Sequence, residues 1–324
     1  MFSISVLVPT YRRIHDLERC LNALKQQTYP VNEVLVTIRN IDSDTWKFFQ
    51  TYDVGTLNLK TLSIDTPGVV AAMNAGLQSY SSDIIVSTDD DGEPHKDWLE
   101  RLVAHFKDPQ VAGVGGRDWQ YVGSQIKEPG ECEIVGKAQW FGRVIGNHHL
   151  GVGPAREVDV LKGVNMGFRR SAIEGIRFDE RMRGTGAQAH FELAFTLKLR
   201  KQGWKLIYDP LVAVNHYPAQ RFDEDGRDQF NALARTNAIH NETLAILDYL
   251  DGLFSRGVFL AWSLLVGTRE AMGFVQWIRF FPSEGLLAGD KYWASLRGRW
   301  QGYQSWCETT VNLPDKAIRL GKSL

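Results

Sequence analysis

Three adjacent carboxylates, Asp89, Asp90 and Asp91, follow the apolar run Ile84–Val86 and are the strongest chemical signal in the chain. Three like charges side by side repel one another, and a divalent cation is the usual compensation. If strand geometry persists through them, Asp89 and Asp91 project to one face, because side chains alternate along a strand. Two oxygen ligands on one face suit Mg²⁺ or Mn²⁺ that also holds substrate phosphates. The alternative is a solvated acidic turn that caps a helix beginning near Lys96.

The elements that must position these acids follow from the pattern of the first 117 residues. Short β-branched runs alternate there with segments of helical period, which is typical of a parallel sheet with crossover helices. We expect strands at Ile4–Val8, Glu33–Ile38, Leu59–Ile64, Asp83–Ser87 and Val111–Val114. Apolar stripes predict helices around Leu17–Leu24 and Trp98–Phe106. Functional groups in such sheets gather at the carboxyl ends of the strands, where the three acids lie.

The second part of the chain changes character at Arg117. From there to about Leu161, glycine, charged and aromatic residues are frequent and the periodicity fades, so we expect loops that contact an acceptor. A helix over Phe191–Gln202 and a strand over Lys205–Val214 follow. From about Phe222 helical patterns dominate, and we expect one side of a single helix to carry Leu244, Leu247, Leu250 and Leu253.

Composition excludes several classes of protein. The chain has 324 residues, 44% of them apolar, and a net charge of −1, so it lacks the basic excess that binds nucleic acid. Its three cysteines stand far apart, which favours neither a disulfide framework nor a zinc site and indicates a reducing, cytoplasmic setting. The N-terminal run Met1–Pro9 is interpreted as a first strand and not as a signal peptide.

The order of the motifs resembles the family 2 glycosyltransferases, which have the GT-A fold. Three segments carry the resemblance: Val6–Arg13, Asp89–Asp91, and Gly163–Arg170 with Phe178–Glu180 after it. Together they span roughly residues 4 to 218. The resemblance implies an α/β fold with a mostly parallel sheet flanked by helices, and a nucleotide-diphosphate sugar as donor substrate. It implies a metal site at Asp89 and Asp91, and donor contacts from Pro9, Thr10, Tyr11, Arg13, Asp89 and Asp90.

The resemblance also places a catalytic base at the start of the helix near Phe191. The usual second acid of that motif is replaced by Ala194, and counting back from Gly203 aligns Glu192 with the base. A carboxylate there can accept the proton of an attacking hydroxyl. Glu192 has a plainer interpretation as a first-turn acid favoured by the helix dipole. His190 is a rival base, since histidine side chains titrate near neutrality.

Two residues beyond the last predicted strand acquire roles through the resemblance. A histidine placed like His216 resembles a third metal ligand, which favours Mn²⁺ over Mg²⁺ because imidazole suits manganese better. Arg221, with the charged loop Phe222–Arg227, is expected to close over the diphosphate.

The second predicted strand departs from the family pattern, because it ends in Arg39 where many relatives place an acid against the nucleotide base. Either Asp42 or Asp44 substitutes for that acid, or Arg39 reads a different base.

A second departure is Met73, where relatives often carry an arginine near the diphosphate. Asn74 and Gly76 fit the pattern, although helix packing explains them equally well. Charge neutralisation would then fall to the metal and to one of Arg169, Arg170 and Arg221.

These residues predict an inverting transferase that moves a single sugar to an acceptor hydroxyl of a glycan or lipid-linked glycan. The metal neutralises the departing diphosphate, and Glu192 deprotonates the acceptor. A metal-dependent nucleotidyltransferase is one alternative, although the turn Pro9–Arg13 lacks the glycine-rich, lysine-bearing loop expected of it. The other is a catalytically decayed scaffold, an interpretation that Met73 and Ala194 support.

We predict a catalytic domain over residues 1–222, with a nucleotide-binding half over 1–117 and an acceptor half over 118–222, and a helical region over 223–324. The run Val258–Phe281 is interrupted by charged residues, so it is not expected to span a membrane. Its aromatic residues beside Arg269 and Arg279 suit peripheral contact with the cytoplasmic face of a membrane. Packing against the catalytic domain or a second subunit is the alternative, and the oligomeric state stays open.

Overall fold

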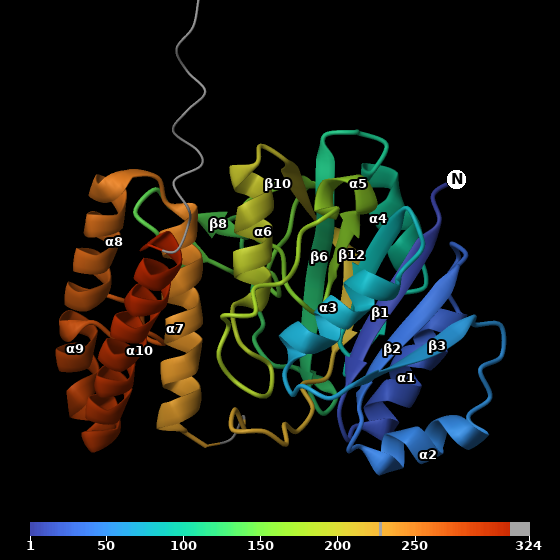
Figure 1. Ribbon diagram of the computed structural model, residues 1–324, viewed down its shortest axis with the longest axis horizontal. Helices are drawn as coiled ribbons and strands as arrows, with labels where there is room; N and C mark the ends of the chain where they lie inside the picture. The colour runs from blue at the N-terminus through green and yellow to red at the C-terminus, as the bar shows by residue number, and fades with distance from the viewer. Residues whose placement is uncertain (227–228, 312–324) are drawn as a thin grey trace, which may run out of the picture.

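A parallel sheet with crossover helices forms the N-terminal half of the computed structural model, which describes residues 1–226 and 229–311 (Figure 1). Its strands are β1 (Ile4–Thr10), β2 (Glu33–Arg39), β3 (Leu59–Ile64) and β4 (Ile84–Ser87). The helices between them are α1 (Ile14–Lys25), α2 (Ser43–Thr51) and α3 (Val69–Ser79). β4, β1, β2 and β3 lie side by side in that order and run parallel. The predicted strands and crossovers of this half are confirmed.

The other half of the sheet is mixed in direction. Its main strands are β6 (Val111–Val122), β10 (Arg156–Val158), β11 (Met166–Arg169) and β12 (Lys205–His216). β11 lies between β4 and β6 and runs antiparallel to both, whereas β12 runs parallel to β6. The short strand β5 (Gly92–Pro94) pairs with the end of β12, and helix α4 (Trp98–His105) follows it. This pairing brings the chain just after the three acids against the end of β12.

The stretch from residue 117 to 161 is loop-rich, as predicted, although β6 continues well past its predicted end. Only short strands interrupt the loops within it: β7 (Gln125–Ile126), β8 (Lys137–Ala138), β9 (Val144–Ile145) and β10. β6 can run so close to β12 because Gly116 lacks a side chain. A Cβ atom at that residue would lie 1.8 Å from the carbonyl oxygen of Val212.

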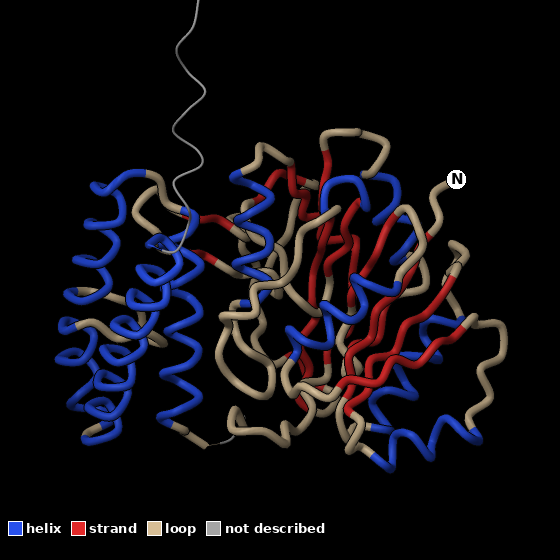
Figure 2. The backbone as a smooth tube through the Cα atoms, in the orientation of Figure 1, coloured by secondary structure: helices blue, strands red, loops and turns tan. Residues whose placement is uncertain are grey.

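Helices form a separate layer beside the sheet in the C-terminal part of the chain (Figure 2). The layer consists of α7 (Ala232–Tyr249), α8 (Gly252–Leu265), α9 (Phe274–Glu284) and α10 (Leu286–Val311). The short α5 (Arg170–Ile173) and α6 (Phe191–Lys201) precede it in the chain, and α6 lies between the sheet and this layer. The expectation of one helix through Leu253 is wrong, because α7 ends at Tyr249 and Leu253 lies on α8, 83% exposed. The break is explained by Gly252, whose φ of 76° is in the left-handed region.

Two apolar clusters cover the two faces of the sheet. One packs alternate residues of β1 and β2 against α1 and α4. The other joins the opposite faces of β1 and β2 to α3, β11 and α6, and continues into α7 and α8 through Leu244 and Phe259. The helical region therefore shares its core with the sheet. Arg227 of the predicted diphosphate loop and the end of the predicted helical region, residues 312–324, lie outside the described residues.

Candidate active site

The three acids form a buried turn. Strand geometry ends at Ser87, so the condition that it persists through Asp91 is not met. A turn closed by a 3.0 Å hydrogen bond from the Gly92 amide to the Asp89 carbonyl follows instead. Asp90 and Asp91 are fully buried, which removes the interpretation as a solvated cap. Helix α4 begins separately, at Trp98.

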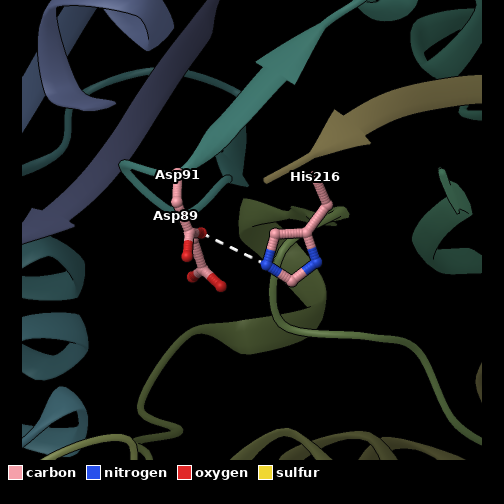
Figure 3. Close-up of side chains that lie close together, drawn as sticks. All are labelled: Asp89, Asp91 and His216. Atoms are coloured by element: carbon pink, nitrogen blue, oxygen red, sulfur yellow. Dashed lines mark ion pairs between the residues drawn. The ribbon is translucent and has the colours of Figure 1, made fainter. Parts of the chain in front are cut away.

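The turn brings Asp89 and Asp91 against His216, the last residue of β12 (Figure 3). One ligand atom from each of these three side chains lies within 4.8 Å of the other two. The imidazole Nε2 of His216 is 3.2 Å from Oδ1 of Asp91, and its Nδ1 is 3.7 Å from Oδ2 of Asp118 on β6. A carboxylate behind a metal-ligating histidine fixes its ring orientation. Two carboxylates and a supported imidazole are a donor set that fits Mn²⁺.

Buried charges surround this triad. The guanidinium of Arg13 lies 3.2 Å from Asp90 and 3.3 Å from Asp91, and the Thr10 hydroxyl donates a 2.7 Å hydrogen bond to Asp90. Burial raises the pKa of Asp90 to about 7, although Arg13 opposes the shift. Burial would also raise the pKa of Asp91, but His216 and Arg13 hold it well below its usual range.

The carboxylates around His216 favour a proton on its imidazole, and a metal ion bound there would displace that proton. Burial alone would lower the pKa of His216, but the contacts with Asp118 and Asp91 raise it to about 9. The same contact outweighs burial at Asp118 and lowers the pKa of that carboxyl to about 2. Four carboxylates thus gather around the two cations Arg13 and His216. A divalent ion would supply the positive charge that this arrangement lacks.

A cavity of about 350 Å³ opens beside the triad. It brings together eight of the predicted site residues: Pro9, Thr10, Tyr11, Arg13, Asp89, Glu192, His216 and Arg221. Glu192 lies in the first turn of α6, and its Oε2 is buried without a hydrogen bond from any described residue. His190, the rival base, lines the same cavity. One cavity is therefore lined by two residues of the candidate metal site, by the candidate base and by the turn after β1.

Residues 5–177, more than half of the chain, match the family model described as Glycosyl transferase family 2. The chain belongs to this family. It is 35% identical over 116 residues to the glycosyltransferase AglE of Haloferax volcanii, which is 35% of this chain and 38% of that protein. It is 29% identical over 207 residues to the pre-mycofactocin glycosyltransferase of Mycobacterium tuberculosis, which is 62% of this chain and 41% of that protein. The chain thus spans about two fifths of the length of these relatives.

Two solved structures confirm the predicted GT-A fold of this family 2 chain. The mannosyltransferase PcManGT from Pyrobaculum calidifontis, in complex with GDP-Man and Mn²⁺, has a TM-score of 0.52 at 16% identity, covering 94% of this chain and 87% of that one. The S. aureus protein TarS, residues 1–349 in complex with UDP-GlcNAc, has a TM-score of 0.53 at 14% identity, covering 95% and 92%.

The departure at the end of β2 places Arg39 in the cavity of this family 2 chain, and not Asp42. Two bonds of 2.9 and 2.8 Å join the Arg39 guanidinium to Asp223, and it lies 4.0 Å from the centre of the Tyr11 ring. Asp42 is buried elsewhere, where it accepts a 2.6 Å hydrogen bond from the Arg12 amide and caps α2. Asp42, one of the residues proposed to contact the nucleotide base, therefore binds backbone amides and does not line the cavity.

Asn74 and Arg170 are likewise not brought to the cavity. The Asn74 amide forms hydrogen bonds of 2.9 and 3.0 Å to the backbone of Phe178, so it joins α3 to a neighbouring loop. Arg170 donates a 2.7 Å hydrogen bond to the Ser81 carbonyl, near the start of β4. Because β11 runs antiparallel to β4, its last residues come to the edge of the sheet opposite the acids. Arg169 is held there as well, by the carbonyl of Val111.

Two residues that sequence reasoning missed belong to this site. Asp118 supports His216, and the only signal for it is an acid near the end of a strand that was expected to stop at Val114. Lys162 lines the cavity, directly before the glycine that opens the Gly163–Arg170 segment. Met73 is buried in the core and carries no charge in place of the arginine that relatives often have there. Among the described residues, the cations that line the cavity besides His216 are Arg13, Arg39, Lys162 and Arg221.

Proposed function

We propose that this chain is an inverting, metal-dependent glycosyltransferase that moves one sugar from a nucleotide-diphosphate sugar to an acceptor hydroxyl. The observation that carries the proposal is the shared cavity. Asp89 and His216 of the metal-capable triad, the turn after β1 and Glu192 all line it. A donor spanning the cavity would have its diphosphate near the triad and its sugar within reach of a base, as this chemistry requires.

Asp89, Asp91 and His216 would hold the divalent ion. When bound, the ion supplies positive charge to the diphosphate as it leaves the anomeric carbon. The Mn²⁺ in the related mannosyltransferase structure supports manganese. Lys162 and Arg221, which line the same cavity, would add further positive charge along the diphosphate.

The contacts of the cavity carboxylates support the proposal of inversion. Among the described residues the carboxylates that line it are Asp89, Glu192, Asp223 and Asp225. Asp89 belongs to the triad, Arg39 holds Asp223, and the Arg221 guanidinium holds Asp225 at 2.9 Å. Glu192 is then the base that takes the acceptor proton while the acceptor oxygen bonds to the anomeric carbon and the bond to the diphosphate breaks. Attack on the face opposite the leaving group inverts that carbon.

The donor and acceptor are proposed by class. The two related structures hold GDP-Man and UDP-GlcNAc, which supports a nucleotide-diphosphate hexose as donor. The loops between residues 117 and 161 would contact a glycan or lipid-linked glycan acceptor.

We also propose that the C-terminal helices contact a membrane surface. No helix among the described residues is long and apolar enough to cross a bilayer. Large apolar side chains nevertheless stand exposed on α9 and α10: Phe274, Val275, Ile278, Phe281, Leu286, Trp293 and Trp300. Arg279 lies among them in sequence, Arg269 lies shortly before them, and both suit anionic headgroups.

Flotation with vesicles of phosphatidylcholine and phosphatidylglycerol tests the membrane contact. We expect the protein to float and the double variant Trp293→Glu, Trp300→Glu to stay at the bottom. Leu211→Glu is the control, since Leu211 is also exposed (59%) but lies on β12, away from these helices. Equal flotation of all three proteins, or none by the wild type, would contradict the contact.

Nucleotide-sugar binding is the direct test of the proposed activity. Thermal shift with GDP-mannose and UDP-GlcNAc, with and without Mn²⁺, should show a stabilisation by the accepted donor that needs the metal. Slow donor hydrolysis with Mn²⁺ should then be measurable for the wild type and lost in Asp91→Asn. Equal hydrolysis by both proteins would contradict the catalytic proposal.

A further inference from the structure

The loop that leads into the Glu192 helix is tied to the C-terminal helical region by one side chain. Asn241 lies on α7 and is fully buried. Its amide nitrogen donates to the carbonyls of Arg183 and Ala189, at 3.0 and 3.1 Å. Its oxygen accepts from the Arg183 amide at 2.8 Å and lies 2.9 Å from Nδ1 of His240. Every donor and acceptor position of the amide is therefore used. One side chain forms hydrogen bonds to both ends of the loop, at Arg183 and at Ala189.

The loop held in this way has an unfavourable backbone. Gln188 and His190 have φ angles of 41° and 74°, in a region that residues with a side chain rarely adopt. Such conformations persist where the surroundings over-determine them, and they cluster at functional sites. The Gln188 side chain adds two ties, accepting from the Val70 amide at 2.9 Å and donating to the Met182 carbonyl at 2.8 Å.

The backbone that Asn241 holds at Ala189 lies directly before the proposed base, Glu192. Ala189 precedes His190, which is the N-terminal cap of α6, and Glu192 lies in the first turn of that helix. The direction in which the Glu192 carboxylate enters the cavity therefore depends on the turn at residues 188–190. Neither the cavity nor the triad includes Asn241, so any effect of Asn241 on catalysis must pass through this backbone.

We propose that Asn241 is a positioning residue for Glu192, and that α7 thereby completes the active site. The inference rests on the proposed role of Glu192 as base. It makes the helical region part of the catalytic unit and not a separable appendage, in agreement with the apolar core that α6 and α7 share.

Asn241→Asp is the sharpest perturbation, because it keeps the shape and the accepted hydrogen bond but removes both donated ones. Thr243→Val is the matched control. Thr243 is on the same helix and equally buried, but its hydroxyl accepts from Arg299 of α10 at 3.0 Å and does not touch the loop. Asn241→Ser serves as a second variant if the aspartate does not fold.

Two readouts test the proposal. Hydrogen–deuterium exchange should quicken at residues 184–194 in the Asn241 variants and stay unchanged there in Thr243→Val. With Mn²⁺ and whichever of GDP-mannose and UDP-GlcNAc the wild type hydrolyses, kcat should fall by roughly 10- to 100-fold at an unchanged donor KM. Thr243→Val should keep the wild-type kcat, even if its melting temperature falls as much as that of the Asn241 variants.

The outcomes separate the inference from the activity on which it rests. Unchanged exchange in the loop would show that Asn241 does not hold it. Quickened exchange with an unchanged kcat would leave the base assignment standing and overturn the positioning role. If the wild type hydrolyses neither donor, or if Glu192→Gln hydrolyses as fast as the wild type, the base assignment fails and the positioning role fails with it.

Discussion

Replacing Glu192 by glutamine tests the assignment of the base with almost no change of shape. Glutamine has the same length and the same planar end group, but it cannot accept the proton of an acceptor hydroxyl. Oε2 of Glu192 is buried without a hydrogen bond from any described residue, so the substitution breaks no contact of that oxygen. We expect the free energy of unfolding to change by no more than about 0.5 kcal/mol.

The expected catalytic loss is much larger. General base catalysis by a positioned side chain typically contributes about 10²- to 10⁴-fold, or roughly 3 to 5 kcal/mol. The loss should appear in kcat, since the residues proposed to hold the donor, Asp89, His216 and the turn after β1, are unchanged. Donor affinity, measured as the concentration dependence of the thermal shift, should stay within about twofold.

His190→Asn is the companion variant, because His190 lines the same cavity and is the rival base. Asparagine tolerates the left-handed φ of 74° better than most residues, so this substitution removes the imidazole and keeps the backbone turn. Transfer or donor hydrolysis by both variants would be followed with Mn²⁺ at fixed pH. A large loss of rate in His190→Asn with little loss in Glu192→Gln would refute Glu192 as the base and assign that role to His190.

Two further predictions concern the metal and acid stability. Asp91→Asn should abolish the Mn²⁺-dependent rise in melting temperature, because it removes one oxygen ligand and the partner of His216; an undiminished rise would place the ion elsewhere. Glu33→Gln should lower the free energy of unfolding at neutral pH by about 1 to 3 kcal/mol, which denaturant titration at several pH values would measure. Burial would raise the pKa of Glu33, but hydrogen bonds from Lys60, Ser5 and Ser81 lower it to about 2. The wild-type advantage should therefore be complete above about pH 4.5 and disappear as pH falls through about 2; an advantage independent of pH would contradict this origin.

The parallel half of the sheet was predictable from the sequence because three of its strands, β1, β2 and β4, are buried on both faces. Every residue of β2 and nearly every residue of β1 is buried, so the strands appear as continuous apolar runs between polar segments. Because three acids follow β4 in the sequence, the end of β4 predicts that they lie at the carboxyl edge of the sheet. The direction of a strand, in contrast, could not be predicted from the sequence. Nothing in Gly163–Arg170 reveals that β11 runs antiparallel, and this direction alone moves Arg170 to the far edge.

Polar residues that serve the backbone resemble ligand-binding residues in sequence. Asp42 caps a helix and Asn74 bridges to Phe178, yet from the sequence both were candidates for contacts with the donor. Whether such a side chain binds the backbone or a ligand depends on which group comes within hydrogen-bond distance, and the fold determines that. Asp118 shows the converse, because its role appears only when β12 carries His216 beside it.

The contact between α7 and the Glu192 loop has the same origin. A helical pattern predicts that residues near 241 form a helix with an apolar face, and an asparagine on that face is a polar group that must find partners when buried. The backbone at residues 183–190 supplies those partners because it cannot supply them to itself. Its two left-handed residues interrupt regular secondary structure and expose carbonyl groups that no helix or strand uses. The buried amide of Asn241 and the irregular turn therefore satisfy each other's hydrogen bonds, and they do so directly before the proposed base.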